Sequence, residues 1–161
     1  MTDLQMAVDD FLAQRRIAVA GVSRTDGNAP ANVIYRKLRD GGYAVFAVNP
    51  HGGEVEGDPC APNLAAIDGG VDGVVVATRP EDTDQVVREC ATLGIPRVWM
   101  HRSFGQGSVS DAAVGLCREH GIRVIAGACP MMYCEPVDFG HKCMRWMLRV
   151  TGGLPKPGAE G

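Results

Sequence analysis

The sequence lacks any long apolar segment and any strong excess of one charge. No run approaches the roughly 20 consecutive apolar residues that a membrane-spanning helix needs, and the N-terminus Met1-Thr2-Asp3 does not have the basic start of a secretion signal. The formal net charge is -3, and the 16 Lys and Arg are scattered rather than gathered in stripes. These absences argue against a membrane or a nucleic acid as partner, and we expect a cytoplasmic protein.

The cysteines do not form the closely spaced pattern of a small disulfide-stabilised protein. Six are scattered along 161 residues, and 45% of the chain is hydrophobic, which is enough for a core without covalent links. We therefore expect reduced thiols and one domain over residues 1–151. Residues 152–161 are rich in Gly and Pro and have few core residues, which predicts a flexible tail.

Short apolar runs alternate with amphipathic segments along the chain. Runs such as residues 73–77 are apolar on both faces, which is typical of a parallel sheet covered by helices on both sides. The sequence therefore predicts an α/β, Rossmann-like fold with a doubly wound, parallel, five-stranded sheet. The strands are expected at residues 17–21, 43–48, 71–77, 97–101 and 122–126. Helices are expected at residues 2–16, between residues 28 and 42, and at 62–67, 81–93, 110–120 and 142–150, with Asp138 as N-cap of the last.

The loop after the first predicted strand has the features of a phosphate site. Ligands of a doubly wound sheet bind outside the carboxyl ends of the strands. The loop from Gly21 to Asn28 offers a glycine, several backbone amides, the positive end of the next helix and the cation Arg24. The same residues also permit a plainer interpretation, in which Gly21 ends a strand and Ser23 caps a helix.

The second loop argues against an ordinary nicotinamide site. The Gly-x-Gly-x-x-Gly dinucleotide pattern is absent, because Ser23 and Asp26 occupy its second and third glycine positions. The second strand is followed by Asn49-Pro50-His51, without the acid that normally holds the ribose hydroxyls of NAD. An adenosine with a 3′-phosphate would be repelled by such an acid. For His51 taken alone, a turn with a surface histidine is the favoured interpretation.

Cations follow three successive strands of the predicted sheet. Arg24, His51 and Arg79 are expected to converge on one rim, which favours a phosphate-rich ligand. His101, at the tip of the fourth strand, is expected to be a polar rim residue, because no nucleophile and orienting acid can be assigned to it. The candidate cofactor-binding residues are Gly21, Val22, Ser23, Arg24, Asn28, Asn49, Pro50, His51, Thr78, Arg79, Pro80 and His101.

The order and spacing of several segments resemble a known family over residues 17–129. These segments are Gly21-Val22-Ser23, Gly42-Tyr43 leading to Val48-Asn49-Pro50, Gly53-Glu54-Val55-Glu56-Gly57, Val98-Trp99-Met100 and Cys129 after the fifth strand. Together they resemble the small stand-alone CoA-binding domain proteins, similar in fold to the CoA-binding N-terminal domain of succinyl-CoA synthetase alpha subunits.

The resemblance implies a location for each part of coenzyme A. Its phosphates would lie at the first turn, its adenosine end at Asn49-Pro50, and residues near Thr78-Arg79-Pro80 would border it. The family often has Lys in place of His51, Gln in place of His101, and Arg-Pro-Ser in place of Asn28-Ala29-Pro30. Relatives that catalyse acyl-CoA chemistry carry their phosphorylated histidine on additional domains, which implies binding without catalysis here.

Three functions are therefore compared. The first is a CoA- or acyl-CoA-binding protein, acting as a homodimer or with a partner enzyme. The second is a nucleotide-dependent enzyme with an atypical NAD(P) mode, or a partner subunit of an acyl-CoA ligase. The third is a metal or redox sensor built on the C-terminal cysteines, although their spacing matches no Cys-x-x-Cys pair and we expect no metal site. The residues concerned are Cys129, Cys134, His141 and Cys143. The tryptophans Trp99 and Trp146 are expected to be core or packing residues, in part at a subunit interface.

Overall fold

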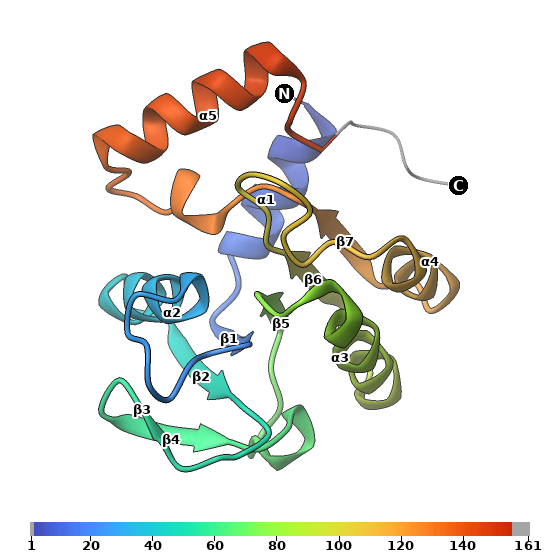
Figure 1. Ribbon diagram of the computed structural model, residues 1–161. Coiled ribbons are helices and arrows are strands. Elements are labelled where there is room, and N and C mark those ends of the chain that lie inside the picture. Colours follow the sequence, from blue (N-terminus) through green and yellow to red (C-terminus); the bar gives the residue numbers. More distant parts are fainter. Residues whose placement is uncertain (1, 156–161) are drawn as a thin grey trace.

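A computed structural model describes residues 2–155 and contains one continuous sheet (Figure 1). The order of its strands is β3-β4-β2-β1-β5-β6-β7. Every neighbouring pair is parallel except β3 and β4, which form an antiparallel hairpin at one edge. The strands are β1 (Arg16–Ala20), β2 (Ala44–Val48), β3 (Glu54–Val55), β4 (Asp58–Ala61), β5 (Gly73–Val76), β6 (Arg97–Met100) and β7 (Arg123–Ala126).

The predicted α/β, Rossmann-like class is confirmed, and the five expected strands form the parallel centre of the sheet. The strand count of five was too low, because the hairpin β3–β4 adds two strands beside β2. These strands have only two and four residues, and β4 contains Pro59, so they lack the alternating apolar pattern that identifies a longer strand.

Five α-helices accompany the strands among the described residues; one precedes the first strand, three connect strands and one follows the last. They are α1 (Asp3–Leu12), α2 (Pro30–Asp40), α3 (Pro80–Leu93), α4 (Asp111–Glu119) and α5 (Phe139–Thr151). The first ends four residues before the predicted Arg16, where β1 already begins. The segment expected as a helix at 62–67 contains only the short 3₁₀ turn η1 (Leu64–Ala66), and a second such turn, η2 (Pro130–Met132), precedes α5. Asp138 is the N-cap of α5, as predicted.

Two hydrophobic cores lie on opposite faces of the sheet. Along β1, Ile17 and Val19 belong to the core beneath α1 and α2, while Ala18 and Ala20 belong to the core beneath α3 and α4. This alternation is the period of two that a strand imposes. Trp99 is fully buried on the first face, where its ring meets that of Phe11 edge-on. The double coverage explains why the strands are apolar on both faces.

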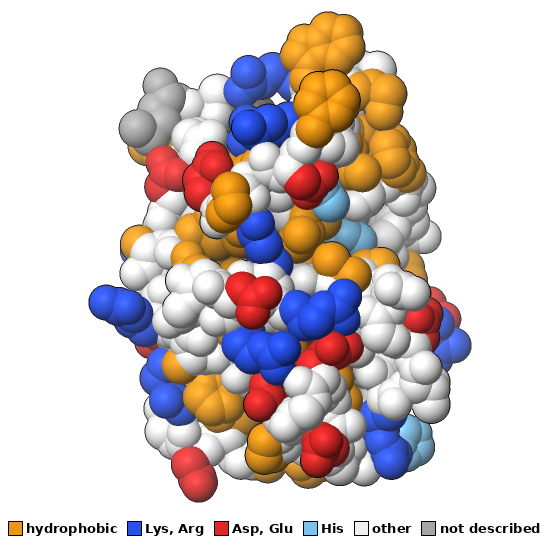
Figure 2. Space-filling model, turned by 90° about the vertical axis from the view of Figure 1, so that its left-hand side faces the viewer, with side chains coloured by type: hydrophobic (Ala, Val, Ile, Leu, Met, Phe, Trp, Pro, Cys, Tyr) orange, Lys and Arg blue, Asp and Glu red, His pale blue; other side chains and the backbone are white. Residues whose placement is uncertain are grey.

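The helix α5 has an exposed apolar side. Phe139, Trp146 and Val150 are between 66% and 83% exposed, and Figure 2 shows apolar side chains gathered at the end of the molecule where Figure 1 places α5. Trp99 is a core residue, as predicted, whereas Trp146 lies outside the core, and its place at a subunit interface stays a prediction. None of the helices in residues 2–155 combines the length and the apolar character that crossing a bilayer demands.

The strand registers place the expected site loops at one edge. Ala20 pairs with both Val48 and Val76, Val76 pairs with Met100, and Met100 pairs with Ala126. Because these strands are parallel, the loops that follow them all leave from the same side of the sheet. This carboxyl edge, defined here as the loops after β1, β2, β5, β6 and β7, is where the candidate residues lie.

Candidate functional site

Gly21 makes the closest contact between two loops of the carboxyl edge. Its φ is +100°, and a Cβ added to it would lie 2.4 Å from the carbonyl oxygen of Ala77. Its amide donates to the carbonyl of Val48. Any side chain at this position would collide with the backbone of the loop after β5. The glycine is therefore required by the packing of the first loop against the third, whatever ligand is bound.

Asn49 joins the first and second loops. Its side-chain amide donates to the carbonyl of Val22 over 2.8 Å, and its side-chain oxygen accepts from the amide of His51 over 2.9 Å. The side chain thus fixes the turn at Asn49-Pro50-His51 and holds it beside the first loop. It serves the backbone of the site, rather than projecting freely toward a ligand.

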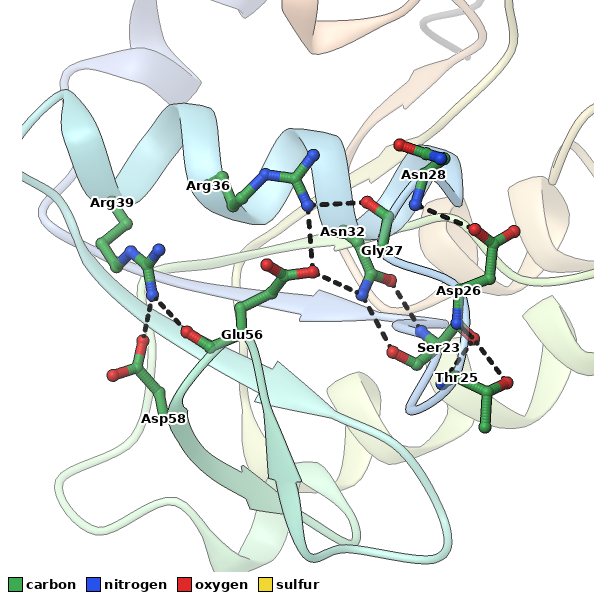
Figure 3. Close-up of polar contacts among 10 residues, drawn as sticks. All are labelled: Ser23, Thr25, Asp26, Gly27, Asn28, Asn32, Arg36, Arg39, Glu56 and Asp58. Carbon is green, nitrogen blue, oxygen red and sulfur yellow. Dashed lines mark hydrogen bonds and ion pairs between the residues drawn. The ribbon is translucent and has the colours of Figure 1, made fainter.

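The first loop is stabilised by hydrogen bonds to its own backbone (Figure 3). The Ser23 hydroxyl accepts from the amides of Thr25 and Asp26, and the Asp26 carboxylate accepts from the amide of Asn28. Within residues 2–155, the amides of Arg24 and Gly27 donate no such bond. Arg24 and Gly27 are exposed, so their amides remain for an anion.

The buried side-chain amide of Asn32 joins this loop to the helix that follows it by hydrogen bonds. Asn32, in the first turn of α2, is 1% exposed. Its side-chain oxygen accepts from the Ser23 amide over 2.7 Å, and its side-chain nitrogen donates to the Ser23 carbonyl and to Glu56. Glu56 also accepts from Arg36, which in turn donates to the Gly27 carbonyl (Figure 3). These contacts hold the loop at both ends.

Sequence reasoning missed Asn32, Arg36 and Glu56. A signal was present for the first, because Asn32 stands on the face of α2 that carries the core residues Ile34, Tyr35 and Leu38 around it. A polar side chain on a buried face needs hydrogen-bond partners. Glu56 comes from the unpredicted hairpin, where it has a φ of +55°. Asn32 and Arg36 hold the pKa of Glu56 below its usual value, so its carboxylate stays charged at neutral pH.

The three predicted cations do not contribute equally to the carboxyl edge. The side chain of Arg79, the N-cap of α3, is 74% exposed and forms ion pairs with Asp82 and Glu81 in the first turn of that helix. Arg24 lies beside the second loop, since its Nε would be 3.5 Å from a Cβ on Gly53. His51 is exposed at the same loop. The structure thus brings Arg24 to the second loop, while the charge of Arg79 is partly balanced by its neighbours; their convergence on a ligand stays a prediction.

Hydrogen bonds from hydroxyl groups join the loop after β5 to the loop after β6. The Ser108 hydroxyl donates to the carbonyl of Thr78, and Thr83 donates to the carbonyl of Ser108. Pro80 is the first residue of α3, where its missing amide hydrogen has no cost. His101 is partly buried after β6, and burial lowers the pKa of its imidazole. This is the half of the edge farther from the β3–β4 hairpin.

The C-terminal cysteines do not assemble a metal site in the described part of the chain. No group of three His, Cys, Asp or Glu there is arranged to hold a metal ion. Cys129 and Cys134 are buried, and burial raises the pKa of the Cys134 thiol to about 11, whereas Cys143 is exposed. His141 instead contacts the Asp138 carboxylate at the start of α5. Leu154 packs against the small core under α5, and residues 156–161 of the predicted tail lie outside the described residues.

A surface hollow of about 270 Å³ lies away from these loops. It is lined by residues 12–15 and 41–43, which directly precede β1 and β2, and is therefore at the amino ends of the strands. No residue of the predicted site lines it. We place the candidate site at the carboxyl edge, because the backbone amides, the cations and the helix N-termini all lie there.

The chain is similar in sequence or in structure to several known proteins. The chain is 33% identical over 116 residues to the uncharacterized protein YneT of Bacillus subtilis, covering 71% of this chain and 82% of YneT. It is 27% identical over 123 residues to the ADP-forming acetate–CoA ligase II of Archaeoglobus fulgidus, covering 71% of this chain but only 18% of the ligase. A hypothetical protein from Pyrococcus horikoshii has a similar structure, with a TM-score of 0.74, 26% identity, and coverage of 85% of this chain and 92% of that chain.

A family model described as the CoA binding domain matches residues 15–135. The matched segment begins just before β1 and ends after η2, so it contains all seven strands and every loop of the carboxyl edge. The predicted resemblance is thereby confirmed, and the chain belongs to the CoA-binding domain family.

Proposed function

We propose that this protein binds coenzyme A or an acyl-CoA at the carboxyl edge of its sheet. The observation that carries the proposal is the family match over residues 15–135, which includes every loop of that edge. Because the acetate–CoA ligase is 18% covered by this chain, the proposal concerns binding and assigns no ligase activity.

The first two loops supply groups suited to the nucleotide end of the cofactor. The amides of Arg24 and Gly27, together with the N-terminus of α2, suit the pyrophosphate. Arg24 and His51 lie at the second loop and suit the 3′-phosphate, and no carboxylate follows β2 at Asn49-Pro50-His51 to repel it. The bonds from Asn49 to Val22 and from Asn32 to Ser23 hold these donors in place before the ligand arrives.

Thermal unfolding in the presence of nucleotides tests the proposal. A ligand that binds only the folded state raises the melting temperature, so CoA and acetyl-CoA are expected to raise it, with much smaller effects of NAD, NADP and ATP. Titration calorimetry would then give the dissociation constant. A shift with NADP and none with CoA would instead support the atypical NAD(P) mode.

The CoA affinities of two arginine variants test whether the site lies at the carboxyl edge. Arg24→Ala is expected to weaken CoA binding. If Arg24 contacts the 3′-phosphate, the substitution should lower the affinity for 3′-dephospho-CoA less than it lowers the affinity for CoA. Arg118→Ala is the matched control, because Arg118 is an exposed cation of α4 outside the carboxyl edge. Equal affinities of both variants and of the unaltered protein would contradict this placement.

A further inference from the structure

Arg102, in the loop after β6, differs from the other partly buried arginines of the structure. Four of these, Arg16, Arg36, Arg97 and Arg145, donate from their guanidinium groups to carbonyl or carboxylate oxygens of other segments. Within residues 2–155, the guanidinium of Arg102 is also partly buried but donates no hydrogen bond and forms no ion pair. Because a charge withdrawn from water needs a partner, this group is suited to an anion supplied by a ligand.

Two neighbouring loops fix the position of Arg102. Its amide donates to the carbonyl of Ala128 over 3.0 Å, which joins the loop after β6 to the segment after β7. Its guanidinium lies directly against Gly127, because a Cβ built on that glycine would be 2.9 Å from a terminal guanidinium nitrogen and 3.1 Å from Nε. Any larger residue at position 127 would displace the charged group. The guanidinium is therefore positioned before a ligand arrives, which lowers the entropic cost of binding.

The two segments around Arg102 contain no acid. They span residues 101–110 and 127–134, and neither includes Asp or Glu. Burial lowers the pKa of the His101 imidazole and raises the pKa of the thiols and of the phenol in the second segment, so these groups are neutral at pH 7. Arg102 thus carries the one full charge of these two described segments, and no carboxylate in them competes for it.

The strand order places Arg102 beyond the phosphates of a bound CoA. Across the sheet the order is β2, β1, β5, β6 and β7. With the adenosine at the loop after β2 and the pyrophosphate at the loop after β1, two strand spacings, roughly 10 Å, remain between β1 and β6. The uncharged pantetheine arm is long enough to cross them. The group that reaches Arg102 is then the acyl end of the ligand. This step rests on the proposed function.

We propose that Arg102 binds a carboxylate at the far end of the acyl group, so that the preferred ligands are CoA thioesters of dicarboxylic acids. A guanidinium offers parallel N–H donors that match the two oxygens of a carboxylate. A neutral acyl group of the same size would leave these donors without an acceptor. Arg102 is thus a specificity-determining residue, whereas the first two loops hold the nucleotide that all acyl-CoAs share.

Calorimetric titration with ligand pairs of nearly equal shape tests the proposal on the unaltered protein. In malonyl-CoA two carboxylate oxygens replace the two methyl groups of isovaleryl-CoA, and succinyl-CoA and 4-methylpentanoyl-CoA form a second pair with a longer chain. We expect the dicarboxylic member of at least one pair to bind at least tenfold more tightly than its neutral partner. Equal affinities within both pairs would overturn the proposal.

Variants of Arg102 test whether this residue is the origin of the preference. Arg102→Gln should lower the affinity for the dicarboxylic ligand at least tenfold more than the affinity for its neutral partner, and Arg102→Lys should keep part of the preference. Arg118→Gln, which alters an exposed cation of α4, is the matched control and should keep all of it. An equal loss for both members of a pair would mean that Arg102 contacts the shared nucleotide or only supports the fold, and would contradict the assignment.

Unesterified CoA separates this proposal from the proposed function. If CoA and the neutral acyl-CoAs bind but the dicarboxylic ligands have no advantage, only the assignment of Arg102 fails. If CoA itself does not bind, the proposed function fails, and the carboxylate site fails with it. The comparison of ligand pairs on the unaltered protein does not depend on the folding of any variant.

Discussion

Gly21 is held against the backbone of another loop, so its substitution should have a large effect. In Gly21→Ala, the new Cβ meets the Ala77 carbonyl at 2.4 Å in a residue with φ of +100°. We expect a loss of roughly 2–4 kcal/mol in the free energy of unfolding, measured by urea denaturation, together with weaker CoA binding.

Gly115→Ala is the control for this change. Gly115 lies within α4, and a Cβ there would have nothing within 4 Å. Alanine is favoured over glycine inside a helix, so this variant should be unchanged or more stable by up to about 1 kcal/mol. Equal effects of the two substitutions would show that the contact with Ala77 is unimportant.

Asn32 is expected to be the most sensitive polar residue of the first loop. In Asn32→Ala, the Ser23 amide and carbonyl lose their partner, and each buried, unsatisfied group costs about 1–3 kcal/mol. Denaturant unfolding should show a loss in this range, and calorimetry should show reduced CoA affinity. Asn28→Ala removes a side chain of the same loop that is exposed, so its stability should change by less than about 0.5 kcal/mol.

These residues show where sequence reasoning succeeds and fails. Gly21 and Ser23 were identified because a glycine and a hydroxyl after a strand have local meanings. The actual partner of Gly21 is Ala77, 56 positions later, and Ser23 is held by Asn32, which pairs with Glu56 of an unpredicted hairpin. Contacts between distant segments are determined by the fold, and no local pattern contains them.

At the scale of elements, an ion pair links α1 to the amino ends of the strands. Asp10 contacts Arg97 of β6 over 2.8 Å and Arg123 of β7 over 3.0 Å. The hydrogen bond from Arg97 is the main cause that lowers the pKa of Asp10. A lowered folded-state pKa means that this stabilisation is present above the usual value near 3.8 and is lost as the pH falls through the lowered value.

Asp10→Asn tests this dependence. At pH 7 the variant should be less stable by about 1 kcal/mol, because the pair is partly exposed. The difference from the unaltered protein should shrink as the pH falls below the usual pKa of a carboxyl group, as measured by urea unfolding at several pH values. A difference independent of pH would mean that the charge of Asp10 contributes nothing.

The elements with a clear apolar pattern were the ones that could be predicted. The helices show a period that repeats over many residues, and the parallel strands, although only four or five residues long, are runs of mainly apolar residues. The hairpin β3–β4 was missed because β3 has only two residues and β4 contains Asp58 and Pro59, and the turn η2 was missed because three residues are too few to show a period. The short helix predicted at 62–67 is a single 3₁₀ turn, in which the Asn63 side chain caps Leu64–Ala66 without a longer helix following.

At the scale of the whole molecule, two cores share one sheet, so the described fold should unfold as a unit. Trp99 is buried in the first core, while Trp146 is 68% exposed. In Trp146→Phe, the fluorescence of Trp99 alone reports on that core. We expect its midpoint in urea to coincide with that of far-ultraviolet circular dichroism. A lower midpoint for Trp99 would indicate that the face under α1 and α2 opens separately.

The architecture was the most predictable property, because strands apolar on both faces and alternating with helices permit few arrangements. The location proposed for the site, at the carboxyl edge, follows from that architecture. The roles of individual cations did not follow, since Arg79 interacts with Asp82 one turn later, a pairing that the count of charged residues does not reveal.

The pairing of Arg79 with Asp82 and of Arg36 with Glu56 also affects how the protein responds to salt. These guanidinium groups already have carboxylates as counterions, so a polyphosphate that approaches the carboxyl edge encounters a weakly charged surface rather than a concentrated positive field. Attraction over long distances is therefore small, and recognition depends on contacts made after arrival. The affinity of the proposed site for CoA should accordingly vary little with ionic strength.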